Sequence, residues 1–319
     1  MITALVAIAG VAREAAAQSS AHMKDTVPSL TDGVPIVHEA RGADDMALVF
    51  VYGWKCDRFC WADQLQRFAS EHRVVAVDLA GHVTSGLDRR DWTIEAFGGD
   101  VAAVVEKLGL SRVVLVGHSM NGDVIAEGAR QLFGRVVGMV WVDTDRTLGA
   151  GHTPAQVEAF VATLRTHFAD STRKVVRGMM RLTSDPALVE RIAVDLASAA
   201  PSVALDAVEH FFHHSRTMPG ALQTLKLPVV AINPDDGPTD VASLARHGVR
   251  VVVILGVGHF AMLEGPTPFE RTTAGCDCDV REMSTVIVLD ILQVEARSIT
   301  GGTAHAELSP ASPCARSPP

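Results

Sequence analysis

A serine in a short glycine-containing turn is the residue of this sequence best suited to covalent chemistry. Ser119 lies in the motif Gly-His-Ser-Met-Asn-Gly at 117–122, directly after the apolar run Val113–Val116 and before a segment with helical periodicity. A sharp strand-to-helix turn lifts a serine hydroxyl above a sheet, and the helix N-terminus behind it favours developing negative charge. The position of Ser119 therefore predicts a nucleophile.

A serine hydroxyl is a poor nucleophile at neutral pH and needs an adjacent base. The predicted base is His259, in the loop 256–260 that directly follows the apolar run Val251–Leu255. This loop lies at the carboxyl end of a predicted strand, and such ends converge on one crevice in a parallel sheet. Its place in the chain, rather than its residue type, distinguishes His259 from the other histidines.

The base in turn needs an acid that holds its tautomer. The acid is expected after the preceding apolar run, Val229–Ile232, where the loop 233–240 contains three aspartates. Asp235 lies closest to the predicted strand end and is the predicted acid. Asp236 and Asp240 remain as alternatives, and an aspartate that is not the acid is expected to cap a turn.

Acyl transfer also requires hydrogen-bond donors for the oxyanion of the tetrahedral intermediate. The backbone N–H of Met120, which follows the predicted nucleophile, is one candidate donor. The other is the backbone N–H of Trp54, in the segment Tyr-Gly-Trp at 52–54 after the apolar run Ala47–Val51.

The segments that must position these residues alternate between strand-like and helix-like patterns. Continuous apolar strands interleaved with helices are typical of a parallel sheet covered on both faces, which predicts the α/β class. The predicted strands are Ala47–Val51, Val74–Val77, Val113–Val116, Val136–Val142, Val229–Ile232 and Val251–Leu255. The predicted helices between the first four are Trp61–Ser70, Ile94–Leu108 and Asp123–Leu132.

A block without strand signals interrupts this alternation. The segments Pro154–Phe168, Pro186–Ala199 and Ser202–Phe212 have the pattern of amphipathic helices. We therefore expect a helical cap at 146–225, inserted into a core formed by 34–145 and 226–295. Residues 1–33 are expected to be a leader or mobile arm, and 296–319 a disordered tail.

The amino-acid composition is that of an ordinary globular protein. Of the 319 residues, 48% are hydrophobic and 20% charged, and the formal net charge is -9. This charge argues against a nucleic-acid partner, which requires a concentrated cationic surface. No apolar run reaches the ~18 residues of a membrane-spanning helix. The apolar stretch Ile2–Ala12, followed by alanines at 15–17, resembles a signal peptide and favours export, with a cytoplasmic location as the alternative.

The five cysteines provide no disulfide framework that spacing alone can define. Cys56 and Cys60 lie four positions apart at a predicted helix start and are interpreted as a buried pair of free thiols, with a bridge as the alternative. Cys276 and Cys278 stand two apart, which is not a zinc-site spacing.

Taken together, the motifs resemble those of the α/β-hydrolase superfamily, in particular its small capped branch of esterases, lactonases, haloperoxidase-like enzymes and carbon–carbon hydrolases. The resemblance covers about 34–269 and includes the turn Asp-Leu-Ala-Gly-His-Val-Thr-Ser at 78–85. Two residues depart from it. Tyr52 replaces the histidine usual before the oxyanion glycine, and Asn121 replaces the second glycine of the elbow, where its tolerance of left-handed dihedrals is expected to preserve the turn.

The resemblance implies a serine hydrolase that cleaves carboxylic esters of small or medium acyl or aryl groups, or lactones, without metal or organic cofactor. Cleavage of a carbon–carbon bond or an amide by the same fold, and a non-catalytic ligand sensor, are the alternatives. The expected partner is a small-molecule ester; the oligomeric state is not predicted. The candidate pocket residues are Tyr52, His118, Phe160, Phe211 and Phe260. The cap histidines His210, His213 and His214 are interpreted as a solvated helix face, with a metal site as the alternative.

Overall fold

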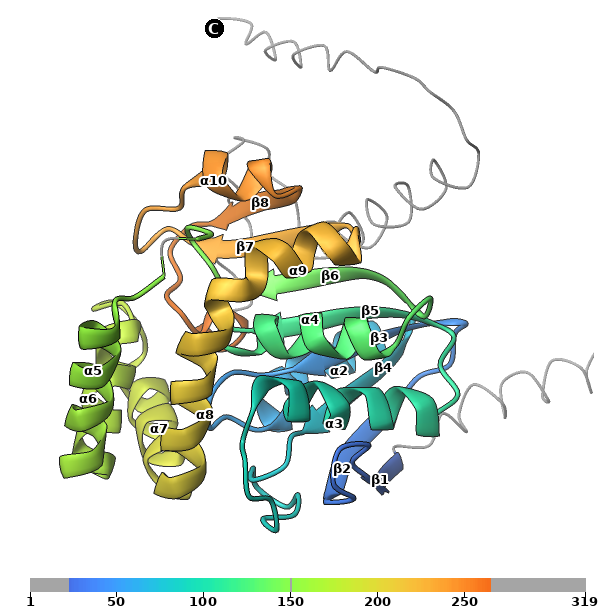
Figure 1. The fold of residues 1–319 in the computed structure, drawn as a ribbon, viewed down its shortest axis with the longest axis horizontal. Coiled ribbons are helices and arrows are strands. Elements are labelled where there is room, and N and C mark those ends of the chain that lie inside the picture. Colours follow the sequence, from blue (N-terminus) through green and yellow to red (C-terminus); the bar gives the residue numbers. More distant parts are fainter. Residues whose placement is uncertain (1–22, 150, 265–319) are drawn as a thin grey trace, which may run out of the picture.

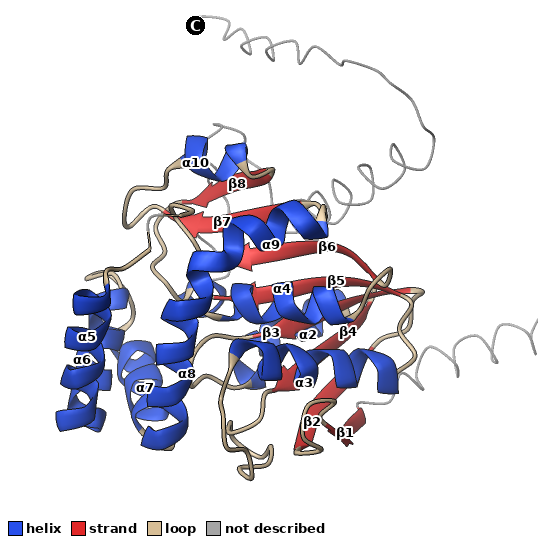
Figure 2. Cartoon of the chain, in the orientation of Figure 1, coloured by secondary structure: helices blue, strands red, loops and turns tan. Residues whose placement is uncertain are grey.

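A computed structural model describes residues 23–149 and 151–264, which form an eight-stranded sheet with helices packed on its faces (Figure 2). The strand order is β1-β2-β4-β3-β5-β6-β7-β8; β2 pairs antiparallel with both β1 and β4, and the remaining pairs are parallel. The strands are β1 (Met23–Pro28), β2 (Pro35–Arg41), β3 (Met46–Val51), β4 (Arg73–Asp78), β5 (Arg112–His118), β6 (Val136–Val142), β7 (Val229–Pro234) and β8 (Val249–Ile254).

The continuous apolar runs arise because both faces of the sheet are covered. Alternate residues of a strand point to opposite faces, and in β3 the two sets of side chains enter different cores. Ala47, Val49 and Val51 pack with one set of helices, whereas Leu48 and Phe50 pack on the other face. A strand with one solvated face would alternate apolar and polar residues instead.

Three helices cover the first face and present their apolar sides to the strands (Figure 1). These are α3 (Ile94–Lys107), α4 (Asn121–Gln131) and α9 (Met218–Leu225). Thr93 begins α3, since its hydroxyl accepts a hydrogen bond from the backbone N–H of Ala96. The opposite face packs against η1 (Arg58–Trp61), α2 (Ala62–Phe68) and α11 (Ala261–Glu264). The helix α10 (Val241–Arg246) lies between β7 and β8 in the chain.

A group of four helices between β6 and α9 forms the cap, beyond the carboxyl ends of the parallel strands (Figure 1). These are α5 (Pro154–Thr166), α6 (Phe168–Met179), α7 (Pro186–Ala197) and α8 (Pro201–His214), after which the turn η2 (Ser215–Thr217) leads into α9. Three of them begin with proline, whose fixed φ suits the first helical position and whose missing N–H costs nothing there.

The six predicted strands are all present, with ends that differ by at most two residues, and the parallel sheet is confirmed. The first two strands were not predicted, and β1 lies within the segment 23–33 that was assigned to the leader or arm. At this sheet edge only Val27 of β1 is buried, so the strand lacks the apolar alternation on which the prediction depended. Residues 1–22 and 265–319, with the predicted signal peptide and tail, lie outside the described residues.

Within 23–149 and 151–264, no helix combines the length and apolarity that a membrane crossing requires.

Candidate active site

Ser119 occupies a strained turn between β5 and α4. Its φ is 55°, a left-handed value that non-glycine residues seldom adopt. The turn is held on both sides, because the N–H of Ser119 donates to the carbonyl of Val142 at 2.9 Å and its own carbonyl accepts from Gly122 at 3.1 Å. This is the elbow geometry expected from the sequence, in which the surrounding structure maintains a backbone strain of ~1–3 kcal/mol.

Two glycines of the motif are required by close packing rather than by their dihedral angles. A methyl group on Gly117 would lie 2.4 Å from the carbonyl oxygen of Asn121, and one on Gly122 would lie 2.2 Å from the side chain of Thr144. Asn121 itself begins the helix, and the left-handed residue of the turn is Ser119. The expectation that Asn121 preserves the turn by tolerating a left-handed conformation was therefore wrong.

His259 lies in the loop after β8, beside the elbow, as the sequence predicted. Its Nδ1 is 2.7 Å from Oδ2 of Asp143, a buried carboxylate immediately after β6. Its backbone carbonyl accepts a hydrogen bond from Nε2 of His118, at 2.9 Å, and His118 precedes Ser119 in the chain. The strand ends of β5, β6 and β8 thus bring a serine, an aspartate and a histidine to one edge of the sheet.

Asp143 is held as a carboxylate by two partners. Arg146 binds both of its oxygens, at 2.9 and 3.0 Å, and His259 contacts one of them. Burial opposes ionisation, but these hydrogen bonds and the positive charges outweigh it and lower the pKa of Asp143 to about 2. Asp143 therefore keeps its negative charge at neutral pH, as a group that stabilises an imidazolium must.

None of the three aspartates predicted from the sequence contacts His259. Asp235, the predicted acid, accepts from the N–H of Gly256 at 2.9 Å and pairs with Arg181 at 2.5 Å. Asp236 pairs with Arg146 at 2.5 Å, and Asp240 caps α10 through the N–H of Ser243. The carboxylate on His259 is Asp143, so the structure corrects the prediction that Asp235 orients this base.

The strand order explains this correction. β6 pairs directly with β5, whereas β7 is one strand farther from the elbow, so an acid after β6 starts closer to Ser119. Asp143 reaches His259 through a left-handed backbone, with φ of 43°, while its N–H stays bonded to the carbonyl of Ile232. The signal present in the sequence was an aspartate immediately after the apolar run that ends at Val142.

His118 is a buried support for this arrangement. Its Nε2 must carry the proton because it faces the carbonyl of His259, which only accepts, while Nδ1 accepts from the N–H of Gly53 at 3.3 Å. Burial is the main cause, and the charge of the neighbouring His259 a second one, that together lower the pKa of His118 to about 3. The neutral ring therefore bridges the loop after β3 and the loop that carries His259.

The loop after β3 passes directly against the elbow. A methyl group on Gly53 would lie 3.1 Å from Cβ of Ser119 and 2.8 Å from Nδ1 of His118, so this approach requires glycine. Trp54 follows at this point, and Met120 follows Ser119 at the N-terminus of α4. Both residues predicted to supply oxyanion donors are therefore carried by segments that meet at Ser119.

A family model described as the alpha/beta hydrolase family matches residues 48–272, which include the elbow, Asp143 and His259. The chain belongs to the alpha/beta hydrolase family. The resemblance inferred from the motifs is thereby confirmed.

The relatives of this alpha/beta hydrolase include enzymes of several activities. A non-heme chloroperoxidase of Streptomyces lividans is 35% identical over 115 residues, which cover 35% of this chain and 42% of that protein. A bifunctional esterase/perhydrolase of Acinetobacter calcoaceticus is 38% identical over 97 residues, covering 30% and 35%. The chain thus spans less than half the length of the curated relatives it matches.

A solved thermophilic esterase from Thermogutta terrifontis superposes with a TM-score of 0.68 at 21% identity, covering 85% of this chain and 98% of that one. At this level of identity the match establishes the fold of this alpha/beta hydrolase.

The two departures from the motifs of the family contact each other. Asn121 is fully buried, and its side-chain amide donates a hydrogen bond to the backbone carbonyl of Tyr52. The phenol of Tyr52 donates to Asp78 at 2.5 Å, and Arg58 pairs with the same carboxylate. These bonds fix the backbone immediately before Gly53, so the departures anchor the loop that borders Ser119.

The next residues of this loop are attached to the cap. The indole N–H of Trp54 donates to the carbonyl of Ala204 in α8 at 2.7 Å. The side-chain amino group of Lys55 donates to Thr172 in α6 at 2.7 Å and lies over the rings of Trp54 and Phe168. Burial lowers the pKa of Lys55 to about 6. The cap and the loop after β3 therefore form one packed unit.

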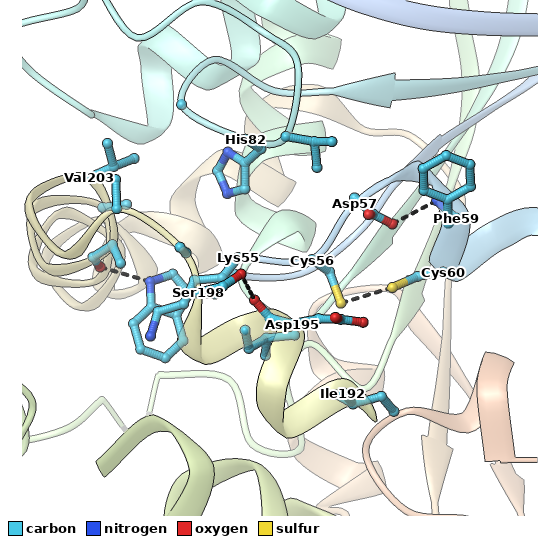
Figure 3. A pocket seen from close by; sticks show the side chains of 18 of the residues that line it. Lys55, Cys56, Asp57, Phe59, Cys60, His82, Ile192, Asp195, Ser198 and Val203 are labelled. Carbon is cyan, nitrogen blue, oxygen red and sulfur yellow. Dashed lines mark hydrogen bonds between the residues drawn. The ribbon is translucent and has the colours of Figure 1, made fainter. Parts of the chain in front are cut away.

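A cavity of about 550 Å³ lies between this loop and the cap (Figure 3). Trp54, Lys55 and Cys56 line it on the core side, and residues of α7 and α8 line it on the cap side. The five candidate pocket residues do not line this cavity. Tyr52, His118 and Phe260 are buried in the core, whereas Phe160 and Phe211 pack around Phe212 in the cap.

One of the cap histidines does not belong to a solvated face. His214 is buried at the end of α8, with Nδ1 2.8 Å from Asp123 and Nε2 3.1 Å from Glu127, both in α4. His213 is exposed, and His210 is partly exposed beside Asp206. The interpretation of all three as a solvated face was wrong for His214, which joins the cap to α4.

Proposed function

We propose that this alpha/beta hydrolase cleaves carboxylic esters, with Ser119 as nucleophile, His259 as base and Asp143 as the orienting acid. The observation that carries the proposal is the 2.7 Å contact between His259 Nδ1 and Asp143 beside the strained elbow. A carboxylate on Nδ1 leaves Nε2 as the acceptor for the serine proton and stabilises the imidazolium that forms. This replaces Asp235 in the role that the sequence suggested.

The reaction follows from the positions of these groups. Ser119 Oγ attacks the ester carbonyl while Nε2 of His259 takes its proton, and the oxyanion accepts hydrogen bonds from the N–H groups of Met120 and Trp54. The imidazolium then gives its proton to the leaving alcohol, which leaves an acyl group on Ser119. Water, deprotonated by His259, attacks this acyl-enzyme and releases the acid.

The named activities of the relatives support an ester substrate, since one of them is an esterase/perhydrolase and a fold neighbour is an esterase. The cavity beside Trp54 is proposed as the space for the acyl or alcohol part of a medium-sized ester, because it starts next to the proposed oxyanion donor.

The test is hydrolysis of p-nitrophenyl esters of increasing acyl length by the native protein, Ser119→Ala and His259→Ala. We expect both variants to lose at least 10³-fold in kcat with their folds retained, because a triad acts as a unit. Unchanged turnover in Ser119→Ala would refute the assignment. If the native protein hydrolyses no ester, an assay with amide and carbon–carbon substrates separates those chemistries from a ligand sensor.

A further inference from the structure

Two thiols lie close together in the segment that follows the proposed oxyanion loop. The Sγ atoms of Cys56 and Cys60 are 2.9 Å apart, and both cysteines are free (Figure 3). A disulfide bond is about 2.05 Å long, so the sulfurs need to approach by only ~0.9 Å to form one. The spacing of four residues indicated either free thiols or a bridge, and the structure provides the geometry for both states.

The backbone holds this pair in position. The N–H of Cys56 donates to the carbonyl of Gly53 at 3.1 Å, and the N–H of Cys60 donates to the carbonyl of Asp57 at 3.0 Å. The carboxylate of Asp57 caps the turn by accepting from the N–H of Phe59 at 2.8 Å. Because this turn already folds Cys60 back over Cys56, closing a bridge requires little backbone movement.

The pair is also reachable by small molecules. Both cysteines line the cavity of about 550 Å³ between the core and the cap, with Cys56 buried and Cys60 half-buried. Of the two, Cys60 is therefore the sulfur that an incoming reagent meets first. Cys56 lies behind it, in contact distance of any oxidised form of Cys60.

We propose that Cys56 and Cys60 are a redox-active thiol pair that closes to an intramolecular disulfide when a hydroperoxide enters the cavity. The thiolate of Cys60 attacks the peroxide oxygen, which gives a sulfenic acid and releases water or an alcohol. The sulfur of Cys56 then attacks the Cys60 sulfur, forms the S–S bond and releases a second water. Two thiols lose two electrons in total, and the peroxide is reduced by the same two.

The bridge would alter a specific part of the fold. It would tie the residue two positions after Trp54 to the helical turn η1, which packs on the sheet face opposite α4. The loop beside Ser119 would then be anchored covalently as well as by its hydrogen bonds. The same pair reopens with a dithiol reductant, because exchange needs only access to one sulfur.

Trypsin provides a test that requires no catalytic turnover, so it is independent of the proposed ester hydrolysis. Cleavage after Lys55, Arg58 and Arg67 places Cys56 in the peptide 56–58 and Cys60 in the peptide 59–67. The native protein is treated with hydrogen peroxide, its remaining thiols are alkylated, and the digest is analysed without reduction. We expect one species with the combined mass of the two peptides less two hydrogen atoms, which dithiothreitol separates.

Cys60→Ser is the matched control, since it exchanges one half-buried sulfur for oxygen and leaves peptide 59–67 without a thiol, so peptide 56–58 must be recovered unlinked to it. Recovery of peptides 56–58 and 59–67 as separate alkylated or sulfinic species after peroxide treatment would overturn the proposal. So would linkage of either peptide to a fragment containing Cys276, Cys278 or Cys314.

Discussion

The buried histidine that joins the cap to α4, the helix after Ser119, is expected to make the stability of this protein depend on pH. His214 is 7% exposed and contacts Asp123 and Glu127 of α4. Burial disfavours its charged form, but the hydrogen bonds and charges of the two carboxylates outweigh burial and raise the pKa of His214 to about 9. The helix dipoles act in the same direction, because the C-terminus of α8 favours a positive charge on His214 and the N-terminus of α4 favours a negative charge on Asp123.

The size of this pH dependence follows from the linkage between proton binding and folding. A rise in pKa from 6.5 to about 9 corresponds to roughly 3 kcal/mol of folding free energy, at about 1.4 kcal/mol for each pKa unit. Because the folded pKa lies above the unfolded one, this stabilisation is fully present below pH 6.5. It is lost progressively as the pH rises through about 9.

The assay is urea unfolding at several pH values between 6 and 10, with His214→Gln and the matched control His213→Gln, an exposed neighbour in the same helix. Across this window we expect the difference in unfolding free energy between the native protein and His214→Gln to shrink by on the order of 3 kcal/mol, because contributions of other groups, such as Lys55, cancel in that difference. The difference between the native protein and His213→Gln should stay constant. If all three proteins show the same pH dependence, His214 does not carry the linked proton and the reasoning fails.

Other predictions concern the site itself. Asp143→Asn is expected to lower kcat for an activated ester on the order of 10⁴-fold, whereas Asp235→Asn, its control, retains most activity; the opposite result would restore the sequence-based acid. Gly122→Ala places a methyl group 2.2 Å from a side chain and is expected to destabilise by ~1–3 kcal/mol in urea unfolding, whereas Gly178→Ala, with nothing within 4 Å, does not. Asn121→Ala leaves the buried carbonyl before Gly53 without its donor, so we expect a loss of ~1–3 kcal/mol and a lower kcat at unchanged KM; a variant with native stability and rate would contradict this role.

Local sequence determined the elements that depend on nearest neighbours. Apolar β-branched runs bounded by turn residues form strands β3 to β8 because both faces of the sheet are covered. Such strands are recognised by their length, their β-branched composition and the turn residues at their ends, without knowledge of their partners. The positions of Ser119 and His259 at strand ends could be predicted for the same reason. Each directly follows an apolar run, and all parallel strands end at one edge.

Tertiary structure decided which distant groups meet. Asp143 and His259 are 116 positions apart, and their contact depends on the placement of β6 beside β5, which no local pattern encodes. The same holds for His214, whose carboxylate partners lie 91 and 87 positions away in α4. The sequence by itself therefore determined the strand ends at which the proposed catalytic residues lie. The order of the strands and the docking of the cap determined which side chains contact Asp143, His259 and His214, because such contacts depend on distance in space.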